Sequence, residues 1–269
     1  MRKWIFSFII IAAASLRPVA AQEGTVYKAS LFGCISDGIT LNTTSIQTAI
    51  NRLSEKGGGS LHFYVGRYLT GTIRLKSNVT IVLHEGAVLV GVPSIYDYDR
   101  PGDAPKGLII AEGQSNIGLV GALPETPSVP STETPEIIGM GVIQGWGARL
   151  RENIDAQHSK GYLESPDPPA LISLVDCEGV KVEGVMMEGA AGDVQSYRNC
   201  RNVSVSRLLV NSREQPGSNG ITFNACRDLS ITDSFFDVTG KPIRSDGNSK
   251  GIKTGGNKSK AGLLPNVSK

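Results

Sequence analysis

The sequence predicts an all-β fold wound as a parallel β-solenoid, and three observations lead to this prediction. The 269 residues include 32 glycines and 14 prolines but only 6% aromatic residues, which is typical of many short strands joined by tight turns. A segment of the chain repeats itself, aligned each time on a cysteine. Within each copy, apolar and polar residues alternate, as in strands with one buried face.

The repeat is clearest where three segments end at Cys177, Cys200 and Cys226, which lie 23 and then 26 residues apart. A unit of this length cannot bury its own apolar face, but units stacked about 4.8 Å apart can bury it together. A β-sandwich, the main alternative, does not require similar residues at one repeat position. We therefore expect the three cysteines to form a row of small side chains inside a solenoid.

One segment near the start of the repeat region is predicted to be helical. Its apolar residues fall on one helix face at Ile46, Ala49, Ile50 and Leu53. Thr44 and Gln47 have the spacing of a capping box, and glycines 57–59 would end the helix. Because a solenoid needs its open end covered, we expect this helix to cap the first coil.

The first 21 residues are expected to be a signal peptide. Arg2 and Lys3 precede an apolar run from Ile5 to Ala14, and small residues precede Gln22. The run is shorter than the roughly 20 residues of a membrane span, so no membrane span is expected. The chain is therefore predicted to be exported to the periplasm or secreted.

Residues 22–269 are expected to form a single solenoid domain. Residues 124–135 are polar and rich in proline, so they are predicted to form an exposed loop between coils. We expect the domain to be incomplete at its C-terminal end, because Lys269 comes where more coils and a terminal cap are expected. The exposed strand edges of such an end would favour self-association, although the protein itself is expected to be a monomer.

Composition and motifs exclude several function classes. The 27 basic and 25 acidic residues nearly cancel, so no basic field indicates a nucleic-acid partner. The four cysteines contain no Cys-x-x-Cys pair and the three histidines are far apart, so neither a metal site nor a cofactor is predicted. Phosphate-binding and serine-hydrolase motifs are also absent.

The motifs of the first half resemble glycoside hydrolase family 28, the polygalacturonase family of right-handed parallel β-helices. The resemblance extends from about Thr25 to Ser234. Its motifs are Phe32-Gly33, Ser36-Asp-Gly38, Asn42-Thr43, Ser45–Ile50, Gly57–Gly59, Gly66–Gly71, Leu75–Thr80 and Gly139–Gly147. In the last motif, Gln144 stands where the family usually has aspartate.

This resemblance implies inverting hydrolysis of α-linked galacturonate chains by carboxylates on adjacent coils. One acid would protonate the departing oxygen while another carboxylate activates water on the opposite face. At the first of these positions the chain has Asn219 in place of aspartate. At the second, one alignment places Gly240-Lys241 over the family's aspartate pair and another places Ser249-Lys250 there. Neither alignment supplies a carboxylate, and the family's Gly-His-Gly and Arg-x-Lys elements are also absent.

The remaining acids nearby are the catalytic candidates. We expect Asp246 and Asp237 to act as acid and base if the protein is catalytic. The alternatives are that Asp246-Gly247 is a turn and that Asp237 caps a coil corner. Five further residues are expected to bind substrate: Asn219, Arg244, Lys250, Lys253 and Tyr197. For Tyr197, packing in the core is the alternative to stacking on a sugar ring.

The predicted function is hydrolysis of O-glycosidic bonds in a pectin-type, galacturonate-containing polysaccharide, an acidic plant-type polymer. One alternative is β-elimination on uronates, with a lysine or arginine as base and Ca²⁺ on the substrate carboxylate. Another is a non-catalytic carbohydrate-binding module or a truncated remnant of the family, consistent with the missing aspartates. The linkage cleaved, and endo or exo action, are left open.

Overall fold

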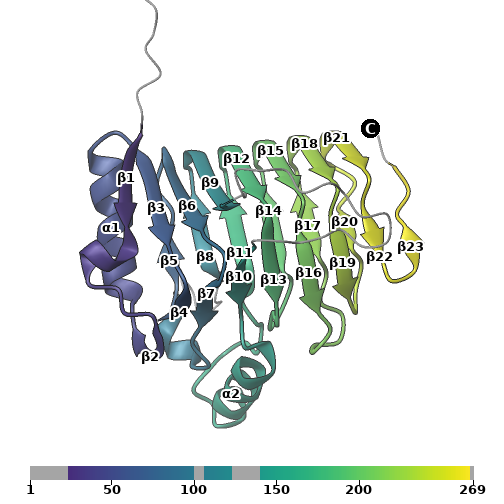
Figure 1. The fold of residues 1–269 in the computed structure, drawn as a ribbon. Coiled ribbons are helices and arrows are strands. Elements are labelled where there is room, and N and C mark those ends of the chain that lie inside the picture. The colour runs from purple at the N-terminus through teal and green to yellow at the C-terminus, as the bar shows by residue number, and fades with distance from the viewer. Residues whose placement is uncertain (1–23, 100–105, 123–139, 267–269) are drawn as a thin grey trace, which may run out of the picture.

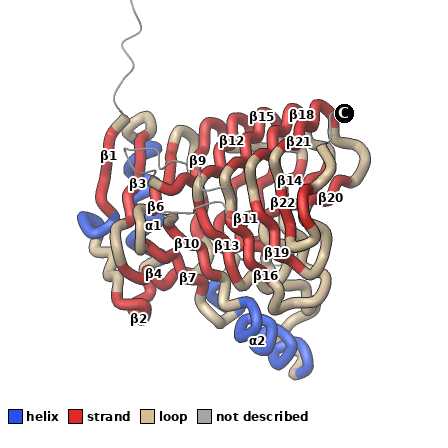
Figure 2. Tube along the Cα trace, turned by 45° about the vertical axis from the view of Figure 1, so that its right-hand side comes forward, coloured by secondary structure: helices blue, strands red, loops and turns tan. Residues whose placement is uncertain are grey.

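The computed structural model describes residues 24–99, 106–122 and 140–266. Within these residues the chain forms three sheets, called A, B and C, that run side by side along the long axis of the molecule (Figures 1 and 2). Neighbouring strands are parallel throughout, except for the antiparallel pair formed by the last two strands, β22 and β23. The prediction of an all-β, right-handed parallel β-helix is confirmed. The predicted signal peptide (1–21) and proline-rich loop (124–135) lie outside the described residues.

Each of the inner coils contributes one strand to each sheet, whereas the first and last coils contribute none to sheet C. Sheet A contains β1 (Thr25–Lys28), β3 (Gly59–Phe63), β6 (Val79–Leu83), β9 (Ser115–Gly121), β12 (Glu178–Glu183), β15 (Arg201–Ser206), β18 (Arg227–Thr232) and β21 (Lys250–Gly255). Sheet B contains β2 (Asp37–Leu41), β4 (Gly66–Thr70), β7 (Ala87–Gly91), β10 (Gly141–Gln144), β13 (Val185–Glu188), β16 (Leu209–Ser212), β19 (Phe235–Val238), β22 (Lys258–Ser259) and β23 (Gly262–Leu263). Sheet C contains β5 (Ile73–Arg74), β8 (Gly107–Glu112), β11 (Ala170–Val175), β14 (Gln195–Arg198), β17 (Ile221–Asn224) and β20 (Ile243–Ser245).

The core is the space between the three sheets. Side chains at one repeat position stack on their equivalents in the next coil, because the strands are in register without gaps from β9 to β18 on sheet A. The predicted cysteine row is confirmed: Cys177, Cys200 and Cys226 are all buried free thiols. Sulfur is soft and compact, so it fills the interior of a corner without demanding a polar partner.

Helix α1 (Thr43–Glu55) covers the first coil, as the sequence predicts (Figure 1). Its buried residues are the expected four, Ile46, Ala49, Ile50 and Leu53. The predicted capping box does not form, because the N-cap is Asn42 and Gln47 instead bonds Asn51 and the backbone of Arg74. The helix ends before Gly57, whose φ of 94° lies in the left-handed region that glycine tolerates.

A second helix, α2 (Gly147–Ser159), interrupts the coils and was not predicted. It projects from the B side of the solenoid, beside the short 3-10 helix η2 (Ile95–Asp97), and another 3-10 helix, η1 (Ala29–Phe32), precedes α1 (Figures 1 and 2). Only Gly147, Leu150 and Ile154 of α2 are buried. Two apolar positions are too few to give a clear helical period in the sequence.

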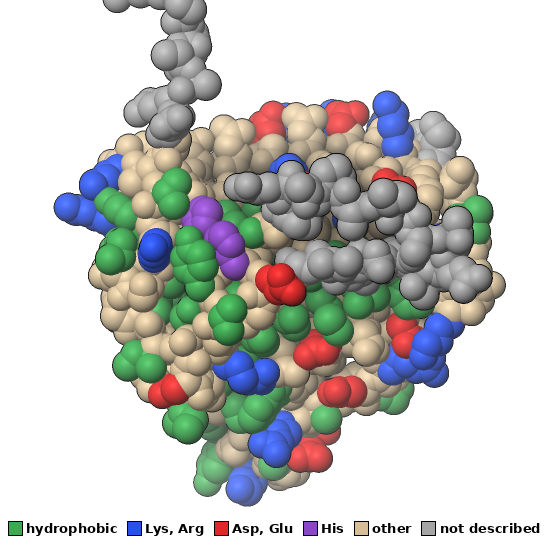
Figure 3. All heavy atoms as spheres, viewed as in Figure 1, with side chains coloured by type: hydrophobic (Ala, Val, Ile, Leu, Met, Phe, Trp, Pro, Cys, Tyr) green, Lys and Arg blue, Asp and Glu red, His purple; other side chains and the backbone are tan. Residues whose placement is uncertain are grey.

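Helices among the described residues are too short and too polar to cross a lipid bilayer. On the face drawn in Figure 3, the described Lys and Arg side chains are scattered among Asp and Glu, without a single continuous basic surface.

Candidate active site

The outer face of sheet C carries a row of polar side chains. The register pairs Ser173 with Ser196, Ser196 with Thr222 and Thr222 with Arg244, each on the next strand of the sheet. Side chains alternate between the two faces of a strand, so the positions next to Ser173, Ser196 and Thr222 point inward; they are apolar or aromatic except for the buried Gln195. This row therefore presents hydroxyl groups and the guanidinium of Arg244 to the outside of the solenoid.

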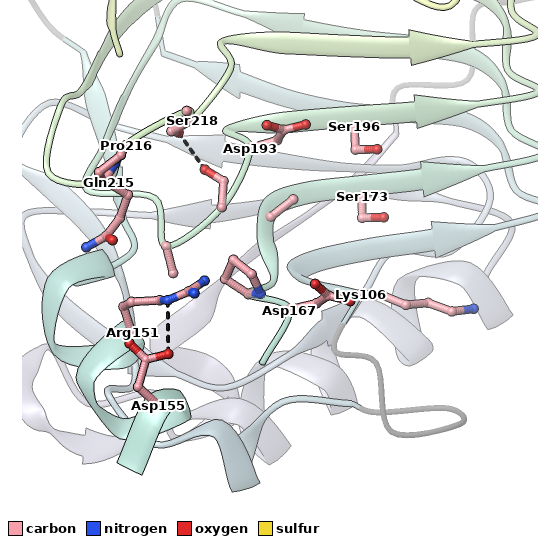
Figure 4. Close-up of a pocket in the computed structure, with 15 residues that line it drawn as sticks. Lys106, Arg151, Asp155, Asp167, Ser173, Asp193, Ser196, Gln215, Pro216 and Ser218 are labelled. Carbon is pink, nitrogen blue, oxygen red and sulfur yellow. Dashed lines mark hydrogen bonds and ion pairs between the residues drawn. The ribbon is translucent and has the colours of Figure 1, made fainter. Parts of the chain in front are cut away.

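A cavity of about 690 Å³ opens where the strands of sheet C begin (Figure 4). We call it the sheet C cavity. Its polar walls come from the connection before β14 (Asp193), the outer face of sheet C (Ser173 and Ser196), the connection after α2 (Asp167) and the residue before β8 (Lys106). Helix α2 adds a further wall. The cavity thus gathers residues from five separate segments of the chain, the fifth being residues 215–218.

Asp193 is held firmly at the edge of this cavity. Its Oδ1 accepts the backbone N–H of Asn219 at 3.1 Å and the side-chain amide of Asn219 at 2.8 Å. Its Oδ2 accepts the hydroxyl of Thr222 at 2.7 Å. Three donors orient the carboxylate as a fixed acceptor, in the way that catalytic carboxylates are commonly positioned.

Hydrogen bonds from the next coil hold the same corner in place. Asn219 is 7% exposed, and its Oδ1 accepts the backbone N–H of Lys241 at 2.9 Å. The hydroxyl of Ser218 donates to the carbonyl of Gly192 at 2.5 Å. These bonds tie three successive coils together, so the position of Asp193 is fixed by the solenoid itself.

The opposite wall of the cavity carries further charges. Arg151 and Asp155, one turn apart on α2, form an ion pair of 3.2 Å. Asp167 is exposed and accepts the hydroxyl of Ser165 at 2.7 Å. Lys106 contacts Glu112 at 3.0 Å. The cavity therefore presents carboxylates and cations side by side, a mixture that suits an acidic substrate whose bonds are broken by acid–base catalysis.

Asp237, one predicted acid, lies on sheet B and does not line the sheet C cavity. Arg213 approaches its Oδ1 at 3.0 Å and Lys260 approaches its Oδ2 at 2.6 Å. Burial alone would raise the pKa of Asp237, but hydrogen bonds and charge from Lys260 and Arg213 outweigh it and hold the pKa below its ordinary value. Asp237 thus occupies an ion-pair network, and its catalytic role stays a prediction.

Asp246, the other predicted acid, follows β20 at the corner where the chain passes from sheet C to sheet A. Its Oδ1 accepts the N–H of Asn248 at 3.1 Å, and its Oδ2 accepts the N–H of Ala225 at 3.3 Å. The contacts are those of a turn that is tied to the coil below it. Asp237 thus lies on sheet B and Asp246 at the corner after sheet C, and the catalytic role of Asp246 also stays a prediction.

The predicted substrate-binding residues are spread over several surfaces. Arg244 is exposed on the outer face of sheet C, in register with Thr222. Lys250 begins β21 at the corner between sheets C and A, and Lys253 is exposed further along that strand on sheet A. Asn219 lies directly behind the cavity wall as the partner of Asp193.

The prediction that Tyr197 binds substrate is wrong. Its side chain points into the core, where it is 1% exposed, and its hydroxyl donates to Gln195 at 2.6 Å. Burial raises the pKa of Tyr197 well above its ordinary value. A ring enclosed in this way cannot stack on a sugar, so the alternative of core packing is correct.

Comparison with known proteins identifies the family. A crystal structure from Parabacteroides merdae, provisionally described as a glycosyl hydrolase, matches with a TM-score of 0.79 and 38% identity, over 91% of this chain and 100% of that chain. A Vitis vinifera protein named a probable polygalacturonase is 42% identical over 230 residues, which is 78% of this chain and 42% of the relative. An exo-poly-alpha-D-galacturonosidase of Dickeya chrysanthemi is 31% identical over 248 residues, which is 79% of this chain and 40% of the relative.

The chain belongs to the polygalacturonase family, glycoside hydrolase family 28. No family model matches the sequence. The chain spans about two fifths of the length of the two curated relatives.

Several cavity residues of this family member were missed by sequence reasoning. The hydroxyl row was readable in principle, because Ser173, Ser196 and Thr222 each stand four residues before a repeat cysteine. Asp167 and Lys106 gave no such signal, since they lie in connections outside the repeat whose path depends on the folded coils.

Proposed function

We propose that this protein is exported and hydrolyses glycosidic bonds in a galacturonate-containing polysaccharide. The observation that carries the proposal is the sheet C cavity, in which Asp193 is oriented by three hydrogen bonds beside cationic side chains. Membership in the polygalacturonase family supports the reaction class. Arg151 and Lys106 would bind uronate carboxylates as they pass through the cavity.

In this proposal Asp193 and Asp167 perform the acid–base chemistry. Asp193, an acceptor for three donors, would take the proton of the attacking water. Asp167, which is exposed on another segment, would donate a proton to the departing glycosidic oxygen. The C–O bond to the leaving sugar breaks as the water oxygen bonds to the anomeric carbon. Inversion requires the two carboxyl groups to lie roughly 6.5–9.5 Å apart when substrate is bound.

A second candidate function is binding of the same polymer without turnover, and the corner behind Asp193 favours it. In one alignment Gly240-Lys241 occupies the position of the family's aspartate pair. A Cβ at position 240 would lie 2.7 Å from the carbonyl oxygens of both Gly217 and Ser218, so this site cannot hold a side chain without moving the backbone. The nitrogen and the oxygen of the Asn219 amide each make a hydrogen bond within the protein. The two functions therefore differ only in whether Asp193 and Asp167 suffice for catalysis.

Product analysis tests the proposal. The purified chain is incubated with polygalacturonate and with rhamnogalacturonan, and both reducing ends and unsaturated, ultraviolet-absorbing products are measured. Hydrolysis gives reducing ends alone, whereas β-elimination with calcium gives unsaturated ends as well. Asp193→Asn is expected to lower the rate by about 100-fold or more, because general base catalysis typically contributes that much. Glu85→Gln, an exposed carboxylate away from the cavity, is the matched control.

Three outcomes decide between the candidates. Loss in Asp193→Asn with full activity in Glu85→Gln supports hydrolysis at the sheet C cavity. Loss in Asp246→Asn or Asp237→Asn, with Asp193→Asn unaffected, would instead assign the acid to those residues. Retained polymer binding without any product from the wild-type chain would replace the hydrolase by the binding module.

Export is tested separately. When the full sequence is expressed in a bacterial host, the protein is expected in the periplasm or the medium with a mass that corresponds to cleavage after Ala21. Full-length protein that stays in the cytoplasm would contradict this part of the proposal.

A further inference from the structure

Three cations stack on one another at the corner where the chain passes from sheet C to sheet A. Arg201, Arg227 and Lys250 are the first residues of β15, β18 and β21, and the register pairs each with the next. Neighbouring parallel strands lie about 4.8 Å apart. All three side chains are exposed. We call this set the basic row.

None of the three cations forms an ion pair with a described residue, although Glu178 is in register with Arg201 on the neighbouring strand β12. Some charges elsewhere on the solenoid are paired: Glu183 contacts Lys181 of its own strand and Arg207 of the next coil at 2.6 Å, and Asp237 lies between two cations. Like charges directly opposite on neighbouring strands repel each other. A row of three exposed cations, none of which is in an ion pair, indicates a binding surface for an anion.

The surface around the basic row is hollowed. A depression of about 270 Å³ is lined by the three cations together with Asn199, Ala225 and Asn248, and no acidic residue lines it. Its floor is a tight backbone corner, with φ values of 53° at Asn199 and 51° at Ala225. Asp246 lies behind this corner and bonds Ala225 and Asn248. The corner therefore holds the cations and the two amides around one concave surface.

This hollow is separate from the sheet C cavity. The cavity lies where the sheet C strands begin, and the basic row follows where they end. Four residues of β14 span roughly 13 Å between the two, at about 3.3 Å per residue. Arg198, the exposed last residue of β14, lies at the end of the strand that leads to the basic row.

We propose that the basic row binds successive carboxylates of a uronate polysaccharide that lies along the solenoid axis, as a second binding surface beside the sheet C cavity. The proposal rests on the proposed function, because it takes the polymer to be the same acidic polysaccharide. A polymer with one carboxylate on each sugar presents a line of anions, and the row presents a line of cations at the coil spacing. The asparagine amides can donate hydrogen bonds to sugar hydroxyls within the same hollow.

Affinity electrophoresis of the purified chain in gels that contain polygalacturonate tests this surface. The variant combines Arg201→Gln, Arg227→Gln and Lys250→Gln. The matched control combines Arg52→Gln, Lys76→Gln and Lys160→Gln, which removes the same charge from exposed positions elsewhere. At low salt the row variant is expected to bind about tenfold more weakly, since exposed ion pairs are individually weak but three act together. The control variant is expected to bind like the wild type.

The results separate this proposal from the proposed function. Equal affinity of the row variant and the control variant, with a wild type that binds or hydrolyses the polymer, overturns the basic row alone. A wild type that neither binds nor cleaves any acidic polysaccharide overturns both. Binding of double-stranded DNA as tight as that of polygalacturonate, lost in the row variant, would show a general polyanion surface and contradict the uronate assignment.

Discussion

Two corners of the solenoid differ in whether their polar side chains are bonded to other residues of the protein or exposed to solvent. At the corner between sheets B and C, Asp193 and Asn219 satisfy each other and the neighbouring coils through short hydrogen bonds. At the corner between sheets C and A, Arg201 and Arg227 face solvent without an ionic partner among the described residues. The backbone differs as well: β14 and β15 are joined by a tight connection, whereas the connections that lead into β14 and β17 are longer.

The difference indicates two functions, one at each corner. A carboxylate that takes part in proton transfer must keep one orientation, which the closed hydrogen-bond network around Asp193 provides. A surface that captures a flexible polyanion gains most from unpaired cations, because charges that are already paired gain less from a new partner. The solenoid allows both, since each coil repeats its scaffold while each corner carries its own residues.

The first test of the difference between the two corners is a core substitution in β14, the strand that joins them. Tyr197 on β14 is 1% exposed and packs inside the coil that joins them. Tyr197→Ala is expected to lower the free energy of unfolding by about 3–5 kcal/mol, the range for deleting a buried aromatic ring. Tyr197→Phe removes only the bond to Gln195, and about 1 kcal/mol is expected. Urea unfolding measures both variants.

The result could also go against the structure. If Tyr197→Ala kept its stability but bound polygalacturonate more weakly, the ring would be accessible to sugars and its placement in the core would be wrong.

The second test concerns a paired charge, the contrast to the basic row. The pKa of Asp237 is lowered in the folded state, so its ion pairs stabilise the fold above the unfolded pKa of about 3.9. That contribution is lost as the pH falls through the lower folded pKa. Asp237→Asn is therefore expected to cost about 1 kcal/mol of unfolding free energy at pH 7, and the difference from the wild type should vanish near pH 2.

Thermal or urea unfolding across this pH range gives the answer, with Arg213→Gln as a matched variant that removes one partner. A deficit that persists at pH 2 would show that Asp237 acts through packing. Normal stability with lost hydrolysis would show that Asp237 is a catalytic acid after all.

The smallest expected effect is the most specific to the basic row. Arg227 lies between Arg201 and Lys250, so Arg227→Gln removes two repulsive contacts. The free energy of unfolding is expected to rise by a few tenths of a kcal/mol at low salt, within the ~0.2–1 kcal/mol of cross-strand pairs. The gain should disappear near 1 M salt, where the Debye length falls to about 3 Å. A loss of stability at low salt would reveal an anionic partner for Arg227.

Much of the fold could be predicted because the coils repeat. The alignment on Cys177, Cys200 and Cys226 fixed which side chains point inward, and the same alignment contains the outward hydroxyl row of sheet C. The capping helix was readable from its four apolar positions. The N-cap residue could not be predicted in this way, because the position of Asn42 depends on hydrogen bonds to Ile35 and Leu69 on other segments.

The site was harder to predict for the same physical reason. Asp193 lies one coil before Asn219, and its orientation follows from bonds between coils that no local pattern encodes. Asp167 belongs to a connection, and only the folded chain brings it to the cavity. Asp237 and Asp246 are close in the sequence, but in the structure Asp237 lies on sheet B and Asp246 lies at the corner after sheet C.

The most direct test of the account is steady-state kinetics on polygalacturonate, with Asp193→Asn and the triple variant of the basic row measured side by side. Asp193→Asn is expected to lower kcat while polymer binding is retained. The row variant is expected to raise KM with kcat unchanged. A row variant that lowers kcat as much as Asp193→Asn, or an Asp193→Asn variant that loses only affinity, would contradict the separation of catalysis and capture between the two corners.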